Sequence, residues 1–175
     1  MKTKLCLLIL LIVGLSVQLS ANPINGLLER IDKGASKKFV IEFKKGADDF
    51  FELDQKGTKV VVRGNNYVNI ATGINWYLKY YAGIQLSWNG MQAKLPQVLP
   101  PVPRKERHET SLSLRYDFNY CTYSYTMAFW DWERWEKEID WMAMHGINMP
   151  LSITGMEVVW YNLLKRIGYT TEEIN

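Results

Sequence analysis

The stretch DWERWEKEIDWMAMHGINMPLSI, residues 131–153, decides the fold of the second half of this 175-residue sequence. Asp131 is a residue type that caps helix N-termini, and Gly146 is the type that most often follows a helix C-terminus. Large apolar residues between them recur at helical spacing and predict one apolar stripe: Trp135, Ile139 and Met142. Residues 147–153 are nearly all apolar, as in a buried parallel strand. We therefore predict a helix to about His145, followed by a parallel strand.

The flanking sequence repeats this alternation of strand and helix. Residues 112–116 are expected to form a strand, and residues 117–130 a long polar and aromatic loop before the helix. A second helix is expected over residues 157–167, and Thr170 with Glu173 forms a capping-box pattern that opens a third. Parallel strands that are connected by helices indicate an α/β fold.

Two such strands leave both edges of their sheet open, so they cannot close a core alone. The sequence also ends at Asn175, inside the third predicted helix. We therefore expect a truncated chain, and the alternative is a small two-domain protein with a frayed tail.

A small α/β accessory domain is predicted for residues 22–95. The local patterns indicate six elements, namely a helix at 24–31, strands at 39–43, 51–54 and 59–63, a helix at 67–81 and a return strand at 84–88. Gly57 can supply the positive φ of a hairpin turn between the second and third strands. Gly83 can end the long helix.

Residues 96–110 are predicted to form a proline-rich linker. Five of the six prolines lie in this segment or at Pro150, and the charged stretch 104–109 completes the segment. Proline cannot continue a strand ladder or a helix, so this composition indicates a domain boundary. The second domain would then span residues 111–175.

The first 21 residues are typical of a secretory signal peptide. Lys2 and Lys4 precede an apolar run at 5–15, and small residues lead to the expected cleavage site after Ala21. The apolar run is too short for a transmembrane anchor, and Cys6 lies too early for a lipidated N-terminus. We therefore predict a protein without a membrane anchor that is secreted or periplasmic. A bacterial periplasm, a cell surface and an animal secretory route all fit this prediction.

Composition excludes some classes of function. Loss of Lys2 and Lys4 would lower the formal net charge from +3 to +1. A charge this small does not indicate a nucleic-acid-binding protein. Cys121 would be the one cysteine left, which excludes an internal disulfide framework. Seven Trp and ten Tyr fit either a large aromatic core or the stacking of rings on sugars.

Four segments carry a resemblance to a known family: RYDFNYCTYSY at 115–125, WDWERWEKEIDWMAMHGIN at 130–148, GMEVVW at 155–160 and TEEIN at 171–175. They are similar to glycoside hydrolase family 89, the α-N-acetylglucosaminidases. Residues 24–103 resemble, more loosely, the small α/β domain that precedes the catalytic barrel in this family and in several other exo-acting glycosidase families.

The resemblance implies a (β/α)8 TIM barrel of about 250 residues, of which residues 111–175 would supply the first two βα units. It also implies a retaining exo-glycosidase that removes terminal α-linked N-acetylglucosamine from glycans. One glutamate would be its nucleophile and another its acid/base. Both would lie beyond Asn175, so we expect no catalytic residue in this fragment and no activity from it alone. The resemblance implies neither a metal nor a cofactor.

Substrate contacts are the part of the site that the resemblance places within this sequence. Asn119 and Cys121 match positions that line the sugar pocket in the family, and Tyr125 is a weaker candidate. An asparagine amide can hydrogen bond to a hydroxyl or acetamido group, and a cysteine is small enough to let a sugar approach. The alternative is that Asn119 caps the loop and Cys121 is ordinary packing.

Other polar residues are interpreted as structural. Four carboxylates of the predicted helix alternate with Arg134 and Lys137, as on a solvated face: Glu133, Glu136, Glu138 and Asp140. The negative charge of Glu157 would stabilise the N-terminus of the second helix through the helix dipole. A positive charge on His145 would stabilise the C-terminus of the first helix in the same way. Neither His145 nor His108 has a partner at metal-ligand spacing.

Two other functions stay open at this point. A different exo-glycosidase with the same accessory domain, such as a β-hexosaminidase or an α-glucuronidase, would differ in its anomer preference. A secreted, non-catalytic glycan-binding module made of residues 24–103 would bind sugar without turnover.

Overall fold

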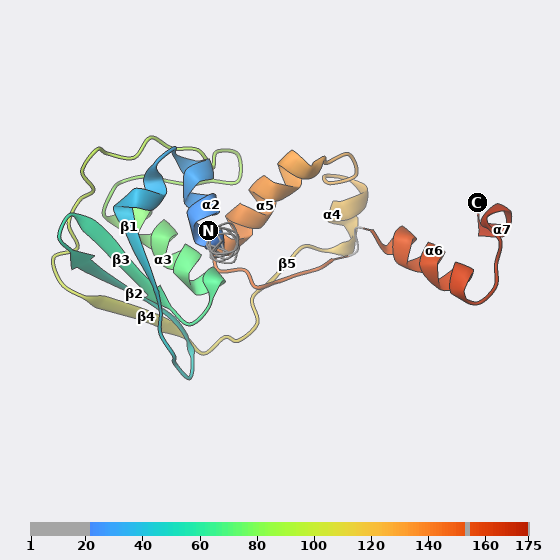
Figure 1. The fold of residues 1–175 in the computed structure, drawn as a ribbon, viewed down its shortest axis with the longest axis horizontal. Coiled ribbons are helices and arrows are strands. Elements are labelled where there is room, and N and C mark those ends of the chain that lie inside the picture. Colours follow the sequence, from blue (N-terminus) through green and yellow to red (C-terminus); the bar gives the residue numbers. More distant parts are fainter. Residues whose placement is uncertain (1–21, 153–154, 175) are drawn as a thin grey trace, which may run out of the picture.

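The computed structural model describes residues 22–152 and 155–174 (Figure 1). The signal peptide predicted at residues 1–21 lies outside these ranges. A four-stranded sheet with two helices forms one end of the molecule, and a strand–helix–strand segment with two terminal helices forms the other (Figure 1). Within the described ranges, every helix falls short of the length and apolarity that crossing a bilayer requires.

The four-stranded sheet has the order β1-β3-β2-β4. β1 (Phe39–Phe43) is parallel to β3 (Lys59–Gly64), while β2 (Asp49–Lys56) is antiparallel to both β3 and β4 (Glu106–Thr110). The first three predicted strands are confirmed, although β2 is longer than expected. Gly57 has a φ of 59° in the turn between β2 and β3, as the hairpin prediction requires.

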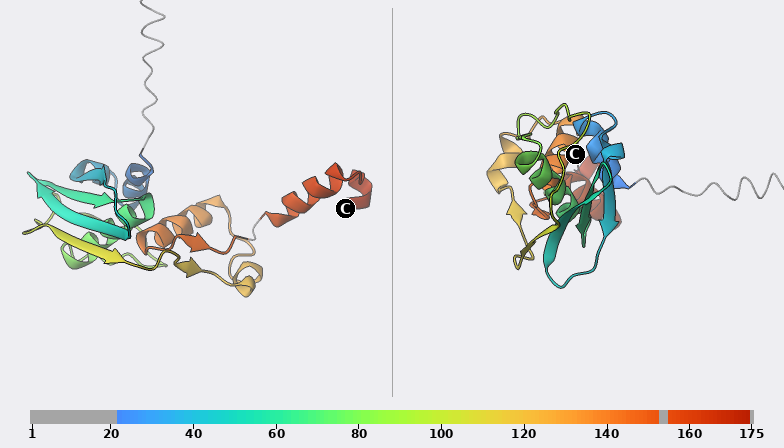
Figure 2. Two further views of the ribbon diagram at one scale, coloured as in Figure 1. Left: turned by 90° about the horizontal axis from the view of Figure 1, so that it is seen from below. Right: turned by 90° about the vertical axis from the view of Figure 1, so that its left-hand side faces the viewer.

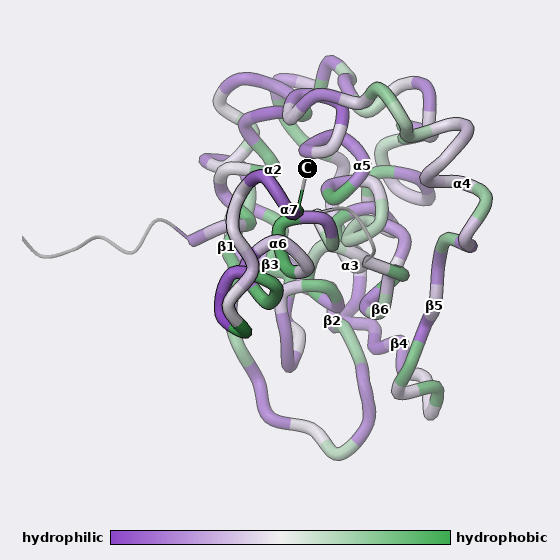
Figure 3. The backbone as a smooth tube through the Cα atoms, turned by 90° about the vertical axis from the view of Figure 1, so that its right-hand side faces the viewer, coloured by the Kyte–Doolittle hydropathy of each residue, from purple (hydrophilic) through white to green (hydrophobic). Residues whose placement is uncertain are grey.

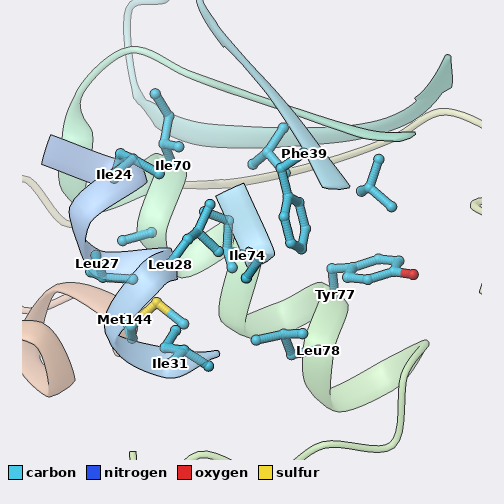
Figure 4. Close-up of a cluster of buried hydrophobic side chains, with 14 of the residues drawn as sticks. Ile24, Leu27, Leu28, Ile31, Phe39, Ile70, Ile74, Tyr77, Leu78 and Met144 are labelled. Atoms are coloured by element: carbon cyan, nitrogen blue, oxygen red, sulfur yellow. The ribbon is translucent and has the colours of Figure 1, made fainter. Parts of the chain in front are cut away.

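Two helices complete the small domain. α2 (Pro23–Ile31) packs against α3 (Tyr67–Tyr80), and α3 packs directly against β2 and β3. A short 3-10 helix, η1 (Ala35–Lys38), connects α2 to β1. Both helices direct apolar side chains into one core, among them Leu28, Ile74 and Tyr77 (Figure 4). The predicted bounds of both helices agree with the structure to within one residue.

A buried carboxylate, Glu52 of β2, lies among three cations. The ammonium groups of Lys44 and Lys105 lie 2.6 and 3.0 Å from its oxygens, and the Arg107 guanidinium lies 3.2 Å away. Burial would raise the pKa of Glu52, but the interactions with these cations outweigh it and lower the pKa to about 2. Arg107 also lies 3.6 Å over the ring of Phe50, so this network ties β4 to β2.

Two segments of the small domain differ from the prediction. Residues 84–88 form no strand, and Ser87 and Gly90 instead close a turn by mutual backbone hydrogen bonds. The fourth strand is β4, which lies inside the segment predicted to be a linker. It pairs with the open edge of β2, where charged residues can stay solvated on one side. The position of the domain boundary stays a prediction.

The segment that leads to β4 also packs closely on the small domain. Three of its side chains are buried in the core: Leu95, Leu99 and Val102. The Tyr77 hydroxyl donates a hydrogen bond to the carbonyl of Pro100. Prolines keep this stretch out of ladders and helices, but they do not prevent its apolar side chains from packing.

The second part contains the predicted parallel pair of strands. β5 (Tyr116–Asp117) lies parallel to β6 (Met149–Pro150), and α5 (Trp132–Met144) connects them. Each strand has two residues, fewer than expected, and β6 is exposed rather than buried because no described element covers it. The predicted loop before α5 contains one short helix, α4 (Tyr120–Ser124).

The chain continues into α6 (Met156–Arg166) and α7 (Thr171–Ile174). The predicted capping box is confirmed, because Thr170 N donates to Glu173 Oε2 at 2.8 Å and Glu173 N donates to Thr170 Oγ1 at 3.3 Å. None of the described residues of α6 is buried. Figure 2 shows both helices projecting beyond α5, and Figure 3 shows hydrophobic stretches along α6 at this end.

α5 joins the two parts of the molecule. It packs against α3, and its last residue, Met144, enters the core of the small domain (Figure 4). Arg30 of α2 donates to both carboxylate oxygens of Asp140, over 2.6 and 2.7 Å. The first βα segment therefore docks on the small domain through both apolar and ionic contacts.

The faces of α5 are arranged differently from the prediction. Met142 of the expected apolar stripe is buried, but Ile139 is 47% exposed. The prediction that Glu138 and Asp140 lie on a solvated face is wrong, because both residues are buried. Hydrogen-bond donors from the small domain reach these two carboxylates, so burial leaves them partnered.

Candidate functional site

A pocket of about 600 Å³ lies beside the carboxyl end of β5. Four segments line it, namely the turn after α3, β5 itself, the loop that follows β5 and one face of α5. They contribute Trp88, Asp117, Asn119, Thr126, Glu138 and Trp141. Aromatic faces, amides and carboxylates are groups that can stack on a sugar and bind its hydroxyls. The carboxyl ends of barrel strands are also where barrel enzymes build their sites.

Asn119 lines this pocket and also caps α4. Its side-chain oxygen accepts hydrogen bonds from the backbone N–H of Thr122 at 3.1 Å and from the hydroxyl of Thr122 at 3.0 Å. The capping role that was the alternative interpretation is therefore present. The side-chain nitrogen makes no hydrogen bond to any residue in the described ranges, so it remains able to donate to a ligand.

Cys121 and Tyr125 lie on α4 and at its C-terminal cap, outside the lining of this pocket. Cys121 is an exposed free thiol, and Tyr125 is 79% exposed. The structure therefore brings Asn119 to the pocket wall and leaves the other two predicted residues on the nearby surface. Their contact with substrate stays a prediction.

Phe118, between β5 and Asn119, has the unusual φ of 74°. A non-glycine residue in this region is strained by about 1–3 kcal/mol, so its surroundings must hold it there. The ring of Phe118 packs edge-on against Tyr123 at 5.9 Å and against Trp135 at 6.4 Å between centroids. These contacts fix the turn that brings Asn119 to the pocket.

Glu138 is the most buried polar group of the pocket, with 1% of its surface exposed. Its Oε2 accepts the indole N–H of Trp88 at 2.6 Å and lies 2.9 Å from the guanidinium of Arg134. Burial raises the pKa of the Glu138 carboxyl, the negative charge of Asp117 adds to this effect, and Trp88 and Arg134 oppose it. Glu138 is thus held by protein groups, which suits a positioning role better than proton transfer to a ligand.

Trp141 offers the pocket an additional donor. Its indole N–H is buried and has no hydrogen-bond partner in the part of the chain that the structure describes. Buried donors of this kind are uncommon, and a ligand hydroxyl or a water can satisfy them.

The prediction from sequence missed Trp88, Glu138 and Trp141. Part of the signal was available, since Arg134, Glu138 and Trp141 are spaced to share one helix face. The contribution of Trp88 had no local signal, because it bonds to a residue 50 positions away.

Within residues 22–152 and 155–174, no three or more His, Cys, Asp or Glu side chains gather in a way that could hold a metal ion. His108 stacks on Phe51 and packs against Trp76 in the small domain, and His145 stacks on Trp141.

Two family models match the chain in consecutive order. Residues 22–101 match the model described as the alpha-N-acetylglucosaminidase (NAGLU) N-terminal domain, and residues 115–175 match its tim-barrel domain. Human alpha-N-acetylglucosaminidase is 39% identical over 144 residues, which are 82% of this chain and 19% of that protein.

Solved structures of a family 89 glycoside hydrolase from Clostridium perfringens are also similar. One is a complex with 2-acetamido-1,2-dideoxynojirmycin, and another is a complex with its substrate GlcNAc-alpha-1,4-galactose. Each has a TM-score of 0.81 and 39% identity, and the match covers 87% of this chain and 18% of that chain. The present chain thus spans about a fifth of the length of the relatives it matches.

Proposed function

The chain belongs to glycoside hydrolase family 89, the α-N-acetylglucosaminidases, and we propose that its full-length protein hydrolyses terminal α-linked N-acetylglucosamine from glycans. One observation carries this proposal. Two models of the same enzyme family match both parts of the chain in the order in which that family has them. A glycan-binding module made of the small domain alone would not account for the second match.

The reaction proposed for the full-length protein is a retaining hydrolysis with two glutamates, one as nucleophile and one as acid/base. Both would lie in the large part of the relatives that this chain does not cover. Residues 111–175 would form the first two βα units of the catalytic barrel, and the chain alone would be inactive. In the described residues, the strands of this part form a two-stranded sheet beside the pocket, and an open sheet of this kind supports this view.

The contribution of this chain to the reaction would be substrate contact. Asn119 presents an amide nitrogen at the pocket wall, and the neighbouring loop carries Cys121 and Tyr125. The Clostridium perfringens relative binds GlcNAc-alpha-1,4-galactose, which supports a glycan with a terminal α-linked N-acetylglucosamine as the substrate class. Asn119 would then hold a hydroxyl or the acetamido group of that sugar.

Export completes the proposal. The N-terminal sequence is typical of a signal peptide, so the protein would be secreted or periplasmic and cleaved near Ala21. N-terminal sequencing of the protein recovered outside the cytoplasm would give Asn22 as its first residue. An N-terminus at Met1 would contradict this part of the proposal.

The direct test compares nitrophenyl α- and β-N-acetylglucosaminide as substrates of the full-length protein and of the 175-residue chain. Cleavage of the α substrate alone, by the long form alone, is the expected result. Cleavage of the β substrate would replace the proposal by a β-hexosaminidase. Sugar binding without turnover by the long form would replace it by a binding module.

In the full-length protein, Asn119→Ala should raise KM for the α substrate, because a hydrogen bond to the sugar is lost. The expected increase is about 10-fold, the effect of one neutral hydrogen bond of about 1.4 kcal/mol. Asn119→Asp is the matched variant, since it keeps the oxygen that caps α4 and lacks the donor. Equal kinetics in wild type, Asn119→Asp and Asn119→Ala would remove Asn119 from the site.

A further inference from the structure

The small domain contacts the pocket through one side chain, Trp88. This tryptophan lies in the turn after α3 that Ser87 and Gly90 close by mutual backbone hydrogen bonds. Its indole N–H donates to Glu138 Oε2 over 2.6 Å, across a separation of 50 residues. The bond therefore links the small domain to α5, which belongs to the first βα segment.

Arg134 makes this contact a three-residue unit. Its guanidinium lies 2.9 Å from the same oxygen of Glu138, one helical turn away on α5. The guanidinium carbon also lies 4.9 Å from the centre of the Trp88 ring. A cation over an aromatic face and a shared carboxylate acceptor both favour the same position of the indole.

The same arginine reaches the loop that carries the predicted sugar contacts. Its guanidinium carbon lies 3.9 Å from the ring of Trp130, the last residue of loop 117–130. Trp130 packs against Trp135 at 5.1 Å, and Trp135 stacks on Tyr123 at 6.0 Å. Tyr123 in turn packs against the strained Phe118 at 5.9 Å. A continuous row of contacts thus runs from the small domain to the residue before Asn119.

The burial of Glu138 makes this arrangement specific. A carboxylate with 1% of its surface exposed is costly to bury without partners, and Trp88 and Arg134 both contact its Oε2. Asp117 is the other charged group that acts on Glu138, and it comes from β5 at the pocket wall. Groups from the small domain, from α5 and from β5 therefore meet at this carboxylate.

We propose that Trp88, Arg134 and Glu138 form an interdomain latch through which the small domain positions loop 117–130, and with it Asn119, at the pocket. Glu138 is thus a positioning residue. The latch gives the small domain a role in substrate recognition without direct contact between its sheet and the sugar. The recognition part of this inference rests on the proposed function, whereas the ordering of the loop does not.

Amide hydrogen exchange of the chain tests the latch without any activity. The Trp88 side chain is 42% exposed, so Trp88→Phe keeps most of the packing and removes the N–H donor. We expect exchange of the amides at 119–130 to become about 10-fold faster, while exchange in β1, β2 and β3 stays unchanged. Trp132→Phe makes the same chemical change at an exposed position of α5 and should leave the loop as in wild type.

Two variants of Glu138 sharpen the test. Glu138→Gln keeps an oxygen that accepts the indole N–H, so it should retain slow exchange in the loop. Glu138→Leu has a similar volume and no acceptor, so it should behave like Trp88→Phe, and the double variant Trp88→Phe/Glu138→Leu should add nothing further. Unchanged exchange in the loop for both Trp88→Phe and Glu138→Leu would overturn the latch. Faster exchange spread evenly over the sheet and the loop would overturn it as well.

The full-length protein separates the latch from the proposed function. With nitrophenyl α-N-acetylglucosaminide, Trp88→Phe should raise KM more than it lowers kcat, because a mobile loop weakens ground-state binding. An inactive wild-type enzyme would refute the proposed function and leave the exchange result standing. If the enzyme is active and Trp88→Phe leaves its KM unchanged, the latch has no role in substrate recognition.

Discussion

Glu52 lies where three segments of the small domain meet. Lys44 follows β1, Lys105 precedes β4 and Arg107 belongs to β4, and all three cations contact this one carboxylate of β2. Because its pKa falls from 4.5 to about 2 on folding, Glu52 stabilises the folded state above pH 4.5. That contribution is lost progressively as the pH falls through this window toward about 2.

We predict that Glu52→Gln makes the free energy of unfolding less dependent on pH between about 2 and 4.5. At neutral pH the free energy of unfolding should fall by about 1–3 kcal/mol, because charge-assisted hydrogen bonds become neutral ones. Urea unfolding between about pH 2 and pH 7, followed by circular dichroism, measures both effects. Glu133→Gln, at an exposed position of α5, is the control and should follow the wild-type curve. A wild-type acid slope in Glu52→Gln would assign the acid sensitivity to other carboxylates.

At the scale of elements, the approach of α3 to the sheet depends on Gly73. A Cβ atom at this position would lie 2.9 Å from Val62 Cγ1 and 3.0 Å from Phe51 Cβ, closer than such atoms pack. The glycine weakens the helix, yet it allows α3 to rest directly on β2 and β3. Close packing therefore outweighs helix propensity at this point.

Gly73→Ala should lower the free energy of unfolding by about 1–3 kcal/mol, although alanine is the better helix former. Gly26→Ala in α2 is the matched control. The new Cβ atom there meets only the end of the Arg30 side chain, at 3.4 Å, so stability should rise by up to about 1 kcal/mol. Denaturant unfolding of both variants measures the difference. A gain of stability in Gly73→Ala would mean that α3 can shift away from the sheet at little cost.

Elements that local patterns specify were predictable from the sequence. The β2–β3 hairpin follows from a glycine between two short strands, and the two long helices from apolar spacing and their caps. β4 was not predictable in this way, because residues 106–110 show no apolar alternation and become a strand only by pairing with β2. The expected strand at 84–88 failed for the converse reason. It has the composition of a strand, but Ser87 and Gly90 close a turn with each other, and β4 is the strand that pairs with the edge of β2.

The candidate site was predictable only in part. Asn119 came from the family resemblance, and the structure places it on the wall of the pocket. Glu138 was assigned to a solvated face because its neighbours on α5 are charged. The packing of α5 on α3 decides otherwise, and single-sequence periodicity contains no information about which helices will meet.

The whole molecule depends on the docking of α5. Met144 adds an apolar contact to the core of the small domain, while Arg30 and Asp140 add a bidentate ion pair between α2 and α5. Pairs of this geometry are among the stronger hydrogen bonds in proteins. We therefore expect the small domain and the first βα segment to unfold together.

Asp140→Ala should uncouple them. Five of the seven tryptophans lie after residue 110, so tryptophan fluorescence reports mainly on the second part, and far-ultraviolet circular dichroism reports on the whole. In wild type the two signals should change at the same urea concentration. In Asp140→Ala the fluorescence should change at a lower urea concentration than the circular dichroism. The free energy of unfolding of the second part should fall by about 1–3 kcal/mol. Lys137→Ala, which breaks an exposed pair with Glu133 on the same helix, should keep the signals coincident. Coincident transitions in Asp140→Ala would locate the coupling elsewhere.

The closing strand of the sheet has a consequence for how such a protein can be rearranged in evolution. β4 is reached only after the chain has wrapped around the small domain, and just five residues, 111–115, separate it from β5. A recombination breakpoint in the proline segment would separate β4 from β1, β2 and β3. The small domain would then lack its fourth strand, and β4 would remain attached to the second part without its pairing partner. A fusion made after Thr110 would instead inherit all four strands of the sheet.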